Sequence, residues 1–160
     1  MAVGGMLGRQ AAAKPSRRTV YLLDVNVLIA LVDPTHVQHA TAHDWFASTG
    51  QAAWASCPTT ENGLLRIVGH SRYPSAPGAP SVVMESLLAI HALTGHQFWP
   101  DDVSLADGRY VDASRLSSHA QVTDSYLLAL AGAHGGRLAS MDRKLVVDAV
   151  IDGKATLALI

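Results

Sequence analysis

The sequence is poor in cysteine, in charge and in long apolar runs, and each shortage excludes a class of protein. Cys57 is the single cysteine among 160 residues, which excludes an intramolecular disulfide framework and a cysteine-based zinc site and fits a reducing cytoplasm. No run approaches the roughly 20 apolar residues that a membrane-spanning helix needs. The formal net charge of −1 gives no global nucleic-acid signal, so any nucleic acid has to be held by local basic groups or through metal ions.

The composition that remains is typical of a globular protein. Apolar residues make up 49% of the chain and charged residues 16%. The length is most simply that of one domain, which we expect over residues 19–160. Residues 1–18 hold four basic residues, three glycines and a proline but no acidic residue, and we interpret them as a flexible basic leader.

The chain is organised around an apolar stretch, Val20–Leu31, that carries one charge, Asp24. The apolar run before Asp24 predicts a buried strand, and the apolar residues after it recur at the three- and four-residue steps of a helix. Asp24 is therefore expected where a strand ends and a helix begins. In an open parallel sheet that is the edge at which ligands bind.

Further strands and helices are predicted along the whole chain. The strands are expected over 52–57, 97–99, 137–140 and 156–160, and the helices over 36–49, 61–68, 81–94, 123–131 and a last segment that includes 144–147. One short helix is expected within 101–120. The alternation predicts an α/β fold with a central parallel β-sheet flanked by α-helices in a single domain.

Three more carboxylates share the position expected for Asp24. Asp142 follows a predicted strand, while Glu61 and Asp124 open predicted helices. Apolar residues lie three, four and seven positions after both Glu61 and Asp124, so both carboxylates are expected on the buried side of their helices, which capping does not require. Each of the four alone could be a helix cap. Together they belong to one edge of the sheet.

Bringing four carboxylates together favours a metal site. Two carboxylates about 5 Å apart repel each other by about 3 kcal/mol at an effective dielectric constant of 20. A divalent cation removes this penalty, and all-oxygen ligands suit Mg²⁺ or Mn²⁺. The chemistry natural to such a site is phosphodiester hydrolysis, in which the metal activates a water and stabilises charge on the leaving oxygen.

Neutral and basic residues accompany the predicted carboxylates. Asn26 and Ser140 each lie two residues from a carboxylate and supply polar groups that can support the metal ligands or bound water. Arg143 and Lys144 adjoin Asp142, and we rate them highest among the basic residues for contact with RNA phosphate.

A second set of possible ligands is weaker. His36, His39 and His43 lie at steps of three and four on one predicted helix, a spacing that can bind zinc. No adjacent glutamate forms an H-E-x-x-H motif, so we interpret this side of the helix as a solvated polar face.

Four acidic segments carry a resemblance to a known family. They are Leu22–Asn26 (LLDVN), Thr60–Asn62 (TEN), Thr123–Ala129 (TDSYLLA) and Ser140–Leu145 (SMDRKL). In this order and spacing they resemble the acidic motifs of PIN-domain ribonucleases, in particular the VapC-type toxins of bacterial type II toxin–antitoxin (VapBC) systems. The resemblance runs from about Val20 to Ile160.

The resemblance implies a PIN-like sheet flanked by helices, Mg²⁺- or Mn²⁺-dependent endoribonuclease activity, homodimers and inhibition by a cognate VapB-type antitoxin. It assigns the acidic ligands to Asp24, Glu61, Asp124 and Asp142. Ser140 stands where many relatives have threonine, and it keeps the hydroxyl. RNA as the substrate, with structured RNA such as tRNA or rRNA as the target, comes from the resemblance alone.

Two alternatives stay open at this point. One is a Mg²⁺-dependent phosphotransfer domain in which Asp24 accepts the phosphoryl group, although Asn26 stands where a haloacid-dehalogenase-like phosphatase has an acidic residue. The other is a non-catalytic PIN-fold module that only binds a partner or RNA. The presence of all four acids favours a nuclease over the binding module, and the acidic pattern of a phosphotransfer domain is not met.

Overall fold

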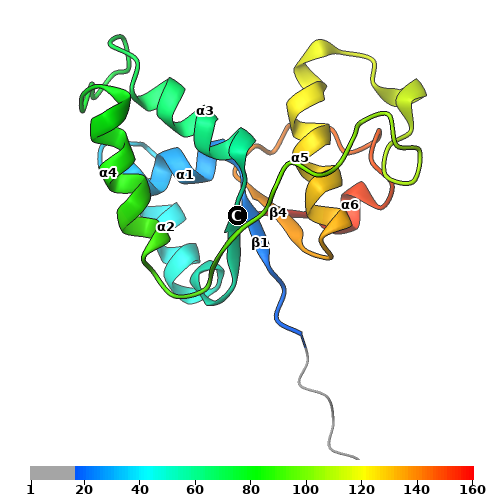
Figure 1. The fold of residues 1–160 in the computed structure, drawn as a ribbon, viewed down its shortest axis with the longest axis horizontal. Helices are drawn as coiled ribbons and strands as arrows, with labels where there is room; N and C mark the ends of the chain where they lie inside the picture. Colours follow the sequence, from blue (N-terminus) through cyan, green and yellow to red (C-terminus); the bar gives the residue numbers. More distant parts are fainter. Residues whose placement is uncertain (1–16) are drawn as a thin grey trace, which may run out of the picture.

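Five parallel strands form the centre of the computed structural model, which describes residues 17–160 (Figure 1). The sheet order is β3-β2-β1-β4-β5, and the strands are β1 (Tyr21–Leu23), β2 (Trp54–Ser56), β3 (His96–Phe98), β4 (Arg137–Ser140) and β5 (Leu157–Leu159). Every neighbouring pair is parallel, with Leu22 paired to Ala55 on one side and to Leu138 on the other. The predicted parallel sheet is confirmed. The predicted leader lies almost wholly outside the described residues.

Helices cover both faces of the sheet (Figure 1). One layer holds α1 (Val25–Val32), α2 (His39–Ser48), α3 (Pro58–Val68) and α4 (Pro80–His91), and the other holds α5 (Val122–Ala133) and α6 (Gly153–Thr156). Because side chains alternate along a strand, Leu23 of β1 joins the core on the first side and Leu22 joins the core on the second. Within residues 17–160, none of the helices has the length and apolar character needed to cross a membrane.

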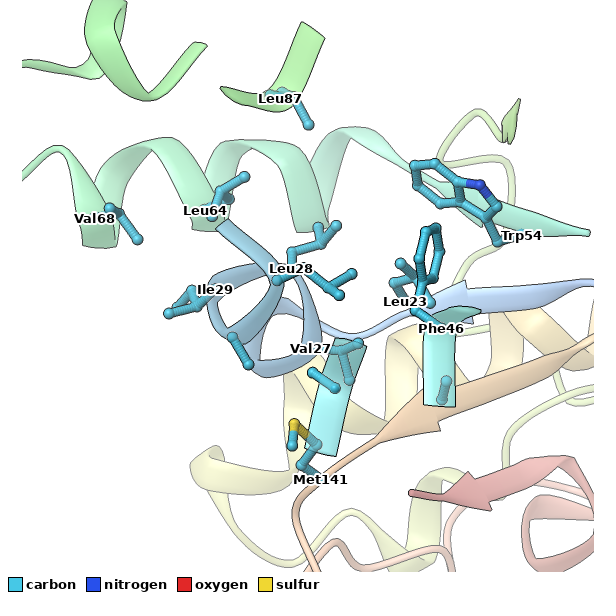
Figure 2. Close-up of a cluster of buried hydrophobic side chains, with 14 of the residues drawn as sticks. Leu23, Val27, Leu28, Ile29, Phe46, Trp54, Leu64, Val68, Leu87 and Met141 are labelled. Atoms are coloured by element: carbon cyan, nitrogen blue, oxygen red, sulfur yellow. The ribbon is translucent and has the colours of Figure 1, made fainter. Parts of the chain in front are cut away.

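The core of the first layer is shown in Figure 2. Leu23, Leu28 and Leu64 bring β1, α1 and α3 into contact there, and all three side chains are buried. Phe46 of α2 meets Trp54 of β2 edge to face, with ring centroids 5.5 Å apart. This packing fixes α1 and α3 against the sheet, and with them the residues that begin each helix.

The order of the strands defines one switch point in the sheet. The chain runs outward from β1 through β2 to β3, and then returns to place β4 and β5 on the other side of β1. Helices that follow β1 and β4 therefore depart on opposite faces, and a crevice opens between the carboxyl ends of these two strands. The backbone N–H of Asp24 still donates to the carbonyl of Ala139 across this pair, at 3.0 Å.

Two predicted helices in the second half of the chain are wrong. Residues 141–150 form turns, and the helix lies later, at Gly153–Thr156. In place of one helix within 101–120, the structure has two single 3₁₀ turns, Ala113–Arg115 and His119–Gln121. The loops over 101–120 and 141–150 contact each other through an antiparallel bridge between Val111 and Val150. Contacts so far apart in sequence leave no local periodicity.

Helices α2, α3 and α4 are present, with ends that differ from the predicted ranges 36–49, 61–68 and 81–94. The core side of α2 is Ala42 and Phe46, whereas Val37, ahead of the helix, is 94% exposed. Pro58 begins α3, since its fixed φ suits the first turn of a helix. In α4, Val83 is buried while Val82 is 43% exposed.

Candidate active site

Asp24 lies at the carboxyl end of β1, where its carboxylate has two partners. It is the N-cap of α1, and its Oδ1 accepts a 2.7 Å hydrogen bond from the backbone N–H of Val25. Its Oδ2 accepts a 2.7 Å hydrogen bond from the hydroxyl of Ser140, the last residue of β4. The residue is only 6% exposed. Asp24 is thus both a cap and a carboxylate held inside the crevice.

Asn26 also makes hydrogen bonds across this crevice, to the end of β4. Its Nδ2 donates to the hydroxyl of Ser140 at 3.2 Å, and its Oδ1 accepts from the backbone N–H of Met141 at 3.2 Å. The Ser140 hydroxyl also accepts from the backbone N–H of Asp142 at 3.1 Å. One fully buried hydroxyl therefore connects Asp24, Asn26 and the turn that carries Asp142. The supporting positions expected for Asn26 and Ser140 agree with these contacts.

Asp124 and Asp142 share the electrostatic environment of Asp24. Burial raises the pKa of Asp124 to about 6, and the negative charges of Asp24 and Asp142 add to the rise. Burial also raises the pKa of Asp24, against the lowering effect of its hydrogen bonds to Ser140 and Val25, and the charge of Asp142 raises it further. The structure therefore brings three of the four predicted carboxylates together at the switch point of the sheet.

A pocket of about 340 Å³ opens beside these carboxylates. Its wall includes Asp124 and Asp142 together with Gln121 and Lys144. The backbone N–H of Lys144 donates to Oδ1 of Asp142 at 2.8 Å, which fixes the turn after β4. Arg143 and Lys144 are both exposed, and Lys144 is the one that lines the pocket. An extended anion such as an RNA phosphate could enter here between a cation and the acidic cluster.

Glu61 has different partners from the three clustered aspartates. It lies in the first turn of α3 and is directed inward, as its spacing predicts, with 18% of its side chain exposed. Its Oε1 accepts a 2.7 Å hydrogen bond from the hydroxyl of Ser56 and lies 3.0 Å from Nε2 of His91. Glu61 is not among the charges that shift the pKa of Asp24 or of Asp124. Its role as the fourth acidic ligand stays a prediction.

Residues that the sequence reasoning missed surround Glu61. Ser56 is fully buried at the end of β2, and its hydroxyl lies 2.8 Å from Nε2 of His96 and 3.3 Å from Nε2 of His91. Burial, followed by the proximity of His91, lowers the pKa of His96 to about 4. His91 ends α4 and His96 begins β3, so no helical spacing relates them. The pairing of β2 with β3 brings His96 to Ser56, and the end of α4 brings His91 there.

The histidines predicted as a solvated face all have hydrogen-bond partners: Nδ1 of His36, ahead of α2, accepts from the backbone N–H of Gln38 at 3.2 Å. A ring nitrogen of His39 lies 2.7 Å from the carbonyl oxygen of Ala30, and one of His43 lies 2.9 Å from that of Leu31. These are carbonyl groups of the last turn of α1, which lack partners within the helix. His39 and His43 therefore join α2 to the end of α1, and His43 remains exposed, as the predicted polar face requires.

Comparison with known proteins defines the family. No protein-family model matches the sequence. The chain is 44% identical over 129 residues to ribonuclease VapC44 of Mycobacterium tuberculosis, covering 81% of this chain and 90% of that protein. It is 45% identical over 124 residues to ribonuclease VapC39 of the same species, covering 78% of this chain and 89% of the relative. The chain belongs to the VapC ribonuclease family.

The fold has a counterpart among solved structures. A chain in the crystal structure of VapBC2 from Rickettsia felis, bound to a DNA fragment from its promoter, superposes with a TM-score of 0.53. The match covers 88% of this chain and 98% of that chain, at 10% sequence identity. At this identity the likeness concerns the fold, and it agrees with the PIN-like architecture expected from the acidic segments.

Proposed function

We propose that the protein is a metal-dependent endoribonuclease that acts as the toxin of a VapBC pair. The observation that carries the proposal is the meeting of Asp24, Asp124 and Asp142 at the switch point of the sheet, which is where open α/β sheets bind their ligands. Its close relatives bear the name ribonuclease VapC, which supports RNA as the substrate. Structured RNA such as tRNA or rRNA is the target class we propose.

The donor set of the crevice fits Mg²⁺ or Mn²⁺. The three clustered groups are carboxylates, and hard divalent cations of this type prefer oxygen ligands. Burial, and then the charges of Asp24 and Asp142, raise the pKa of Asp124 and so disfavour its ionised form, and a bound cation would offset this effect. Asp24, Asp124 and Asp142 would hold the ion, and we propose Glu61 as a further ligand or as a base that orients water.

The catalytic contribution of the chain's own residues follows from their contacts. A bound divalent cation supplies a more acidic water and stabilises charge on the leaving oxygen. Ser140 keeps one carboxylate oxygen of Asp24 hydrogen-bonded and so favours its ionised form. Asn26 holds the turn after β4, so that Asp142 stays at the crevice. Lys144, in the pocket wall, and the exposed Arg143 are placed to bind substrate phosphates.

The sequence around Asp24 disfavours phosphotransfer, because Asn26 stands where a haloacid-dehalogenase-like phosphatase has an acidic residue. Both oxygens of the Asp24 carboxylate accept hydrogen bonds, from Val25 and Ser140. Each oxygen keeps a further lone pair, which a cation in the crevice could use.

The proposed partners are an antitoxin and a second copy of the chain. VapBC2 of Rickettsia felis is a complex, and we propose a VapB-type antitoxin for this chain as well. For a homodimer, α4 offers exposed apolar side chains at Val82, Met84 and Leu88. Light scattering of the purified chain, with and without Leu88→Glu, tests this contact. The cytoplasm, where the proposed RNA substrate is found, is the expected location.

The experiment that tests the proposed function is RNA cleavage by the purified full chain with Mg²⁺, with Mn²⁺ and with a chelator. Asp24→Asn and Asp124→Asn should each slow cleavage by about 100-fold or more, a loss typical of a preorganised charge at the reacting centre. Asp44→Asn, an exposed change on α2, is the matched control and should cut at the wild-type rate. Cleavage by Asp24→Asn at the wild-type rate would show that the site is wrongly assigned, and a wild type inactive with both metals would favour the binding module.

A further inference from the structure

Three metal-ligating side chains meet where α4 ends and β3 begins, on the face of the sheet covered by α3. They are Glu61, His91 and His96, and one ligand atom from each lies within 4.8 Å of the others. Nε2 of His91 lies 3.0 Å from Oε1 of Glu61. The side chains of Glu61 and His91 are 18% and 22% exposed, so the cluster can be reached from solvent without lying open to it.

The surroundings hold these ligand atoms in place. The hydroxyl of Ser56 donates to Glu61 at 2.7 Å and lies within 3.3 Å of both imidazole Nε2 atoms. The rings of His91 and His96 stack at 4.1 Å with an angle of 15° between their planes. Trp54 packs against His96 at 4.4 Å between ring centroids. A buried serine and an aromatic wall therefore orient the two rings so that Nε2 of each lies beside the hydroxyl that binds the Glu61 carboxylate.

We propose that Glu61, His91 and His96 form a binding site for a zinc-like divalent transition-metal ion, separate from the carboxylate cluster at Asp24. Two imidazole nitrogens and one carboxylate oxygen are a ligand set that zinc uses, whereas Mg²⁺ prefers oxygen alone. Neutral imidazole is the form of histidine that binds such an ion.

The spacing of the ligand atoms suits such an ion. Ligands about 2.1 Å from a tetrahedral zinc ion lie about 3.4 Å from one another. The separation between His91 and Glu61 is 3.0 Å, and all three ligand atoms fall within 4.8 Å, so small side-chain rotations bring them to this spacing. The fourth position is left for water. Ser56 would then act as a positioning residue, because its hydroxyl fixes the Glu61 carboxylate.

Occupancy of this site has a consequence for the enzyme that rests on the proposed function. Glu61 is also the fourth acidic residue proposed for the nuclease site. An ion held by Glu61, His91 and His96 would keep this carboxylate beside the two histidines and away from the Asp24 cluster. Zinc is therefore expected to slow RNA cleavage by engaging Glu61 rather than by displacing Mg²⁺.

Calorimetry on the chelator-treated full chain tests the site directly. Zn²⁺ should bind with one equivalent in the presence of excess Mg²⁺, and Co²⁺ should give the visible absorption of a tetrahedral site. His91→Gln, His96→Gln and Glu61→Gln should each weaken Zn²⁺ binding by more than about 100-fold, beyond the loss typical of a merely supporting residue. Glu61→Gln keeps the size of the side chain, so one variant is available that changes little but the charge.

A matched control comes from the second histidine pair. His39 and His43 also pack ring against ring, at 4.2 Å, but their ring nitrogens contact backbone carbonyl groups. His43→Gln should therefore leave Zn²⁺ binding unchanged. Unchanged Zn²⁺ binding in His91→Gln and His96→Gln would overturn the proposal, and so would loss of binding in Asp124→Asn, since the ion would then lie at the acidic cluster.

The zinc site and the nuclease function can fail separately. If Zn²⁺ binds as described but no RNA is cut with Mg²⁺ or Mn²⁺, the proposed function is wrong and the site stands. If RNA is cut and the three variants bind Zn²⁺ like the wild type, the site is wrong and the function stands. If the zinc site and the nuclease function are both correct, Zn²⁺ should slow RNA cleavage by the wild type but not by His96→Gln. Each rate is compared with the rate of the same protein without zinc.

Discussion

The hydroxyl of Ser140 donates a 2.7 Å hydrogen bond to Oδ2 of Asp24 and so joins the ends of the two strands between which the sheet reverses its order. The same hydroxyl accepts hydrogen bonds from Asn26 and from the backbone of Asp142. Its hydrogen-bonding capacity is therefore used completely. The buried serine sets the ionisation of Asp24 and the position of Asp142 together.

Removing this hydroxyl should weaken metal binding and the fold. In Ser140→Ala, Asp24 loses the hydrogen bond that lowers its pKa, while burial still raises it. We expect Mn²⁺ affinity to fall by about 10–100-fold, as for other residues that support a metal ligand. Unfolding should need about 1–3 kcal/mol less free energy, because buried polar groups lose a partner. Calorimetry and urea denaturation measure the two effects.

The control for this prediction is Ser140→Thr, which keeps the hydroxyl. It should retain most of the Mn²⁺ affinity, apart from the effect of one added methyl group in a fully buried position. Equal Mn²⁺ binding by Ser140→Ala and the wild type would show that the hydroxyl does not support Asp24.

Asp124→Asn should stabilise the metal-free protein while abolishing cleavage. The pKa of Asp124 is about 6 in the folded protein, against 3.8 for an ordinary aspartate, so between these pH values the folded state binds more protons than the unfolded state. The wild type therefore loses stability as the pH rises from about 4 to 6 and stays destabilised above that. Asparagine carries no charge, so the variant should be more stable by about 1–3 kcal/mol at pH 8.

Urea denaturation with a chelator at pH 5 and at pH 8 tests this prediction. The advantage of Asp124→Asn should be larger at pH 8, and added Mg²⁺ should remove it, because the ion stabilises the wild type alone. A wild type that is the more stable of the two at pH 8 without metal would contradict the electrostatic account of the cluster.

The sequence predicts the sheet and the common edge of three carboxylates for a simple reason. Asp24 and Asp142 directly follow strands, and Asp124 opens a strongly periodic helix, so their positions depend on local pattern and on the parallel arrangement alone. The carboxyl ends of parallel strands necessarily share an edge. No distant contact had to be known in advance.

The contacts of Glu61 could not be predicted in this way. Its inward direction follows from helical spacing, but its partners His91 and His96 meet Ser56 across sequence separations of 35 and 40 residues. His96 arrives there because β3 pairs with β2 at the edge of the sheet, and His91 arrives there from the end of α4. The turns of 141–150 are a similar case, since a bridge to Val111 replaces the predicted helix.

Asn26→Asp should destabilise the metal-free protein. An aspartate still accepts from the backbone N–H of Met141 but no longer donates to Ser140, and it adds a negative charge beside Asp24. The expected loss is about 1–3 kcal/mol in the free energy of unfolding, part of which Mg²⁺ should recover. Asn62→Asp, an exposed change in α3, is the control and should alter stability by less than about 0.5 kcal/mol. Equal stability of the two variants in chelator would argue against a structural role for the Asn26 amide.

Tyr73 should stabilise the end of α1 in a pH-dependent way. Its hydroxyl donates a 2.6 Å hydrogen bond to Oδ2 of Asp33, the C-cap of α1. Burial raises the pKa of Asp33, but the hydrogen bonds from Tyr73 and Thr35 outweigh it and leave that pKa below its ordinary value. A lowered pKa adds stability above the unfolded pKa, and this stability is lost as the pH falls through the folded value.

Tyr73→Phe should therefore reduce the free energy of unfolding by about 1.5–3 kcal/mol at pH 7, a loss typical of a hydrogen bond to a charged group. The difference from the wild type should shrink only below the ordinary aspartate pKa of 3.8, as the pH falls through the lowered pKa of Asp33 in the folded wild type. Urea denaturation at pH 7 and at successive pH values below 3.8 measures the change, and Tyr110→Phe, which removes a hydroxyl elsewhere, is the control. A loss of the same size at every pH would mean that the Tyr73 hydroxyl stabilises the fold independently of the charge of Asp33, because Tyr73→Phe keeps the ring and removes only the hydroxyl.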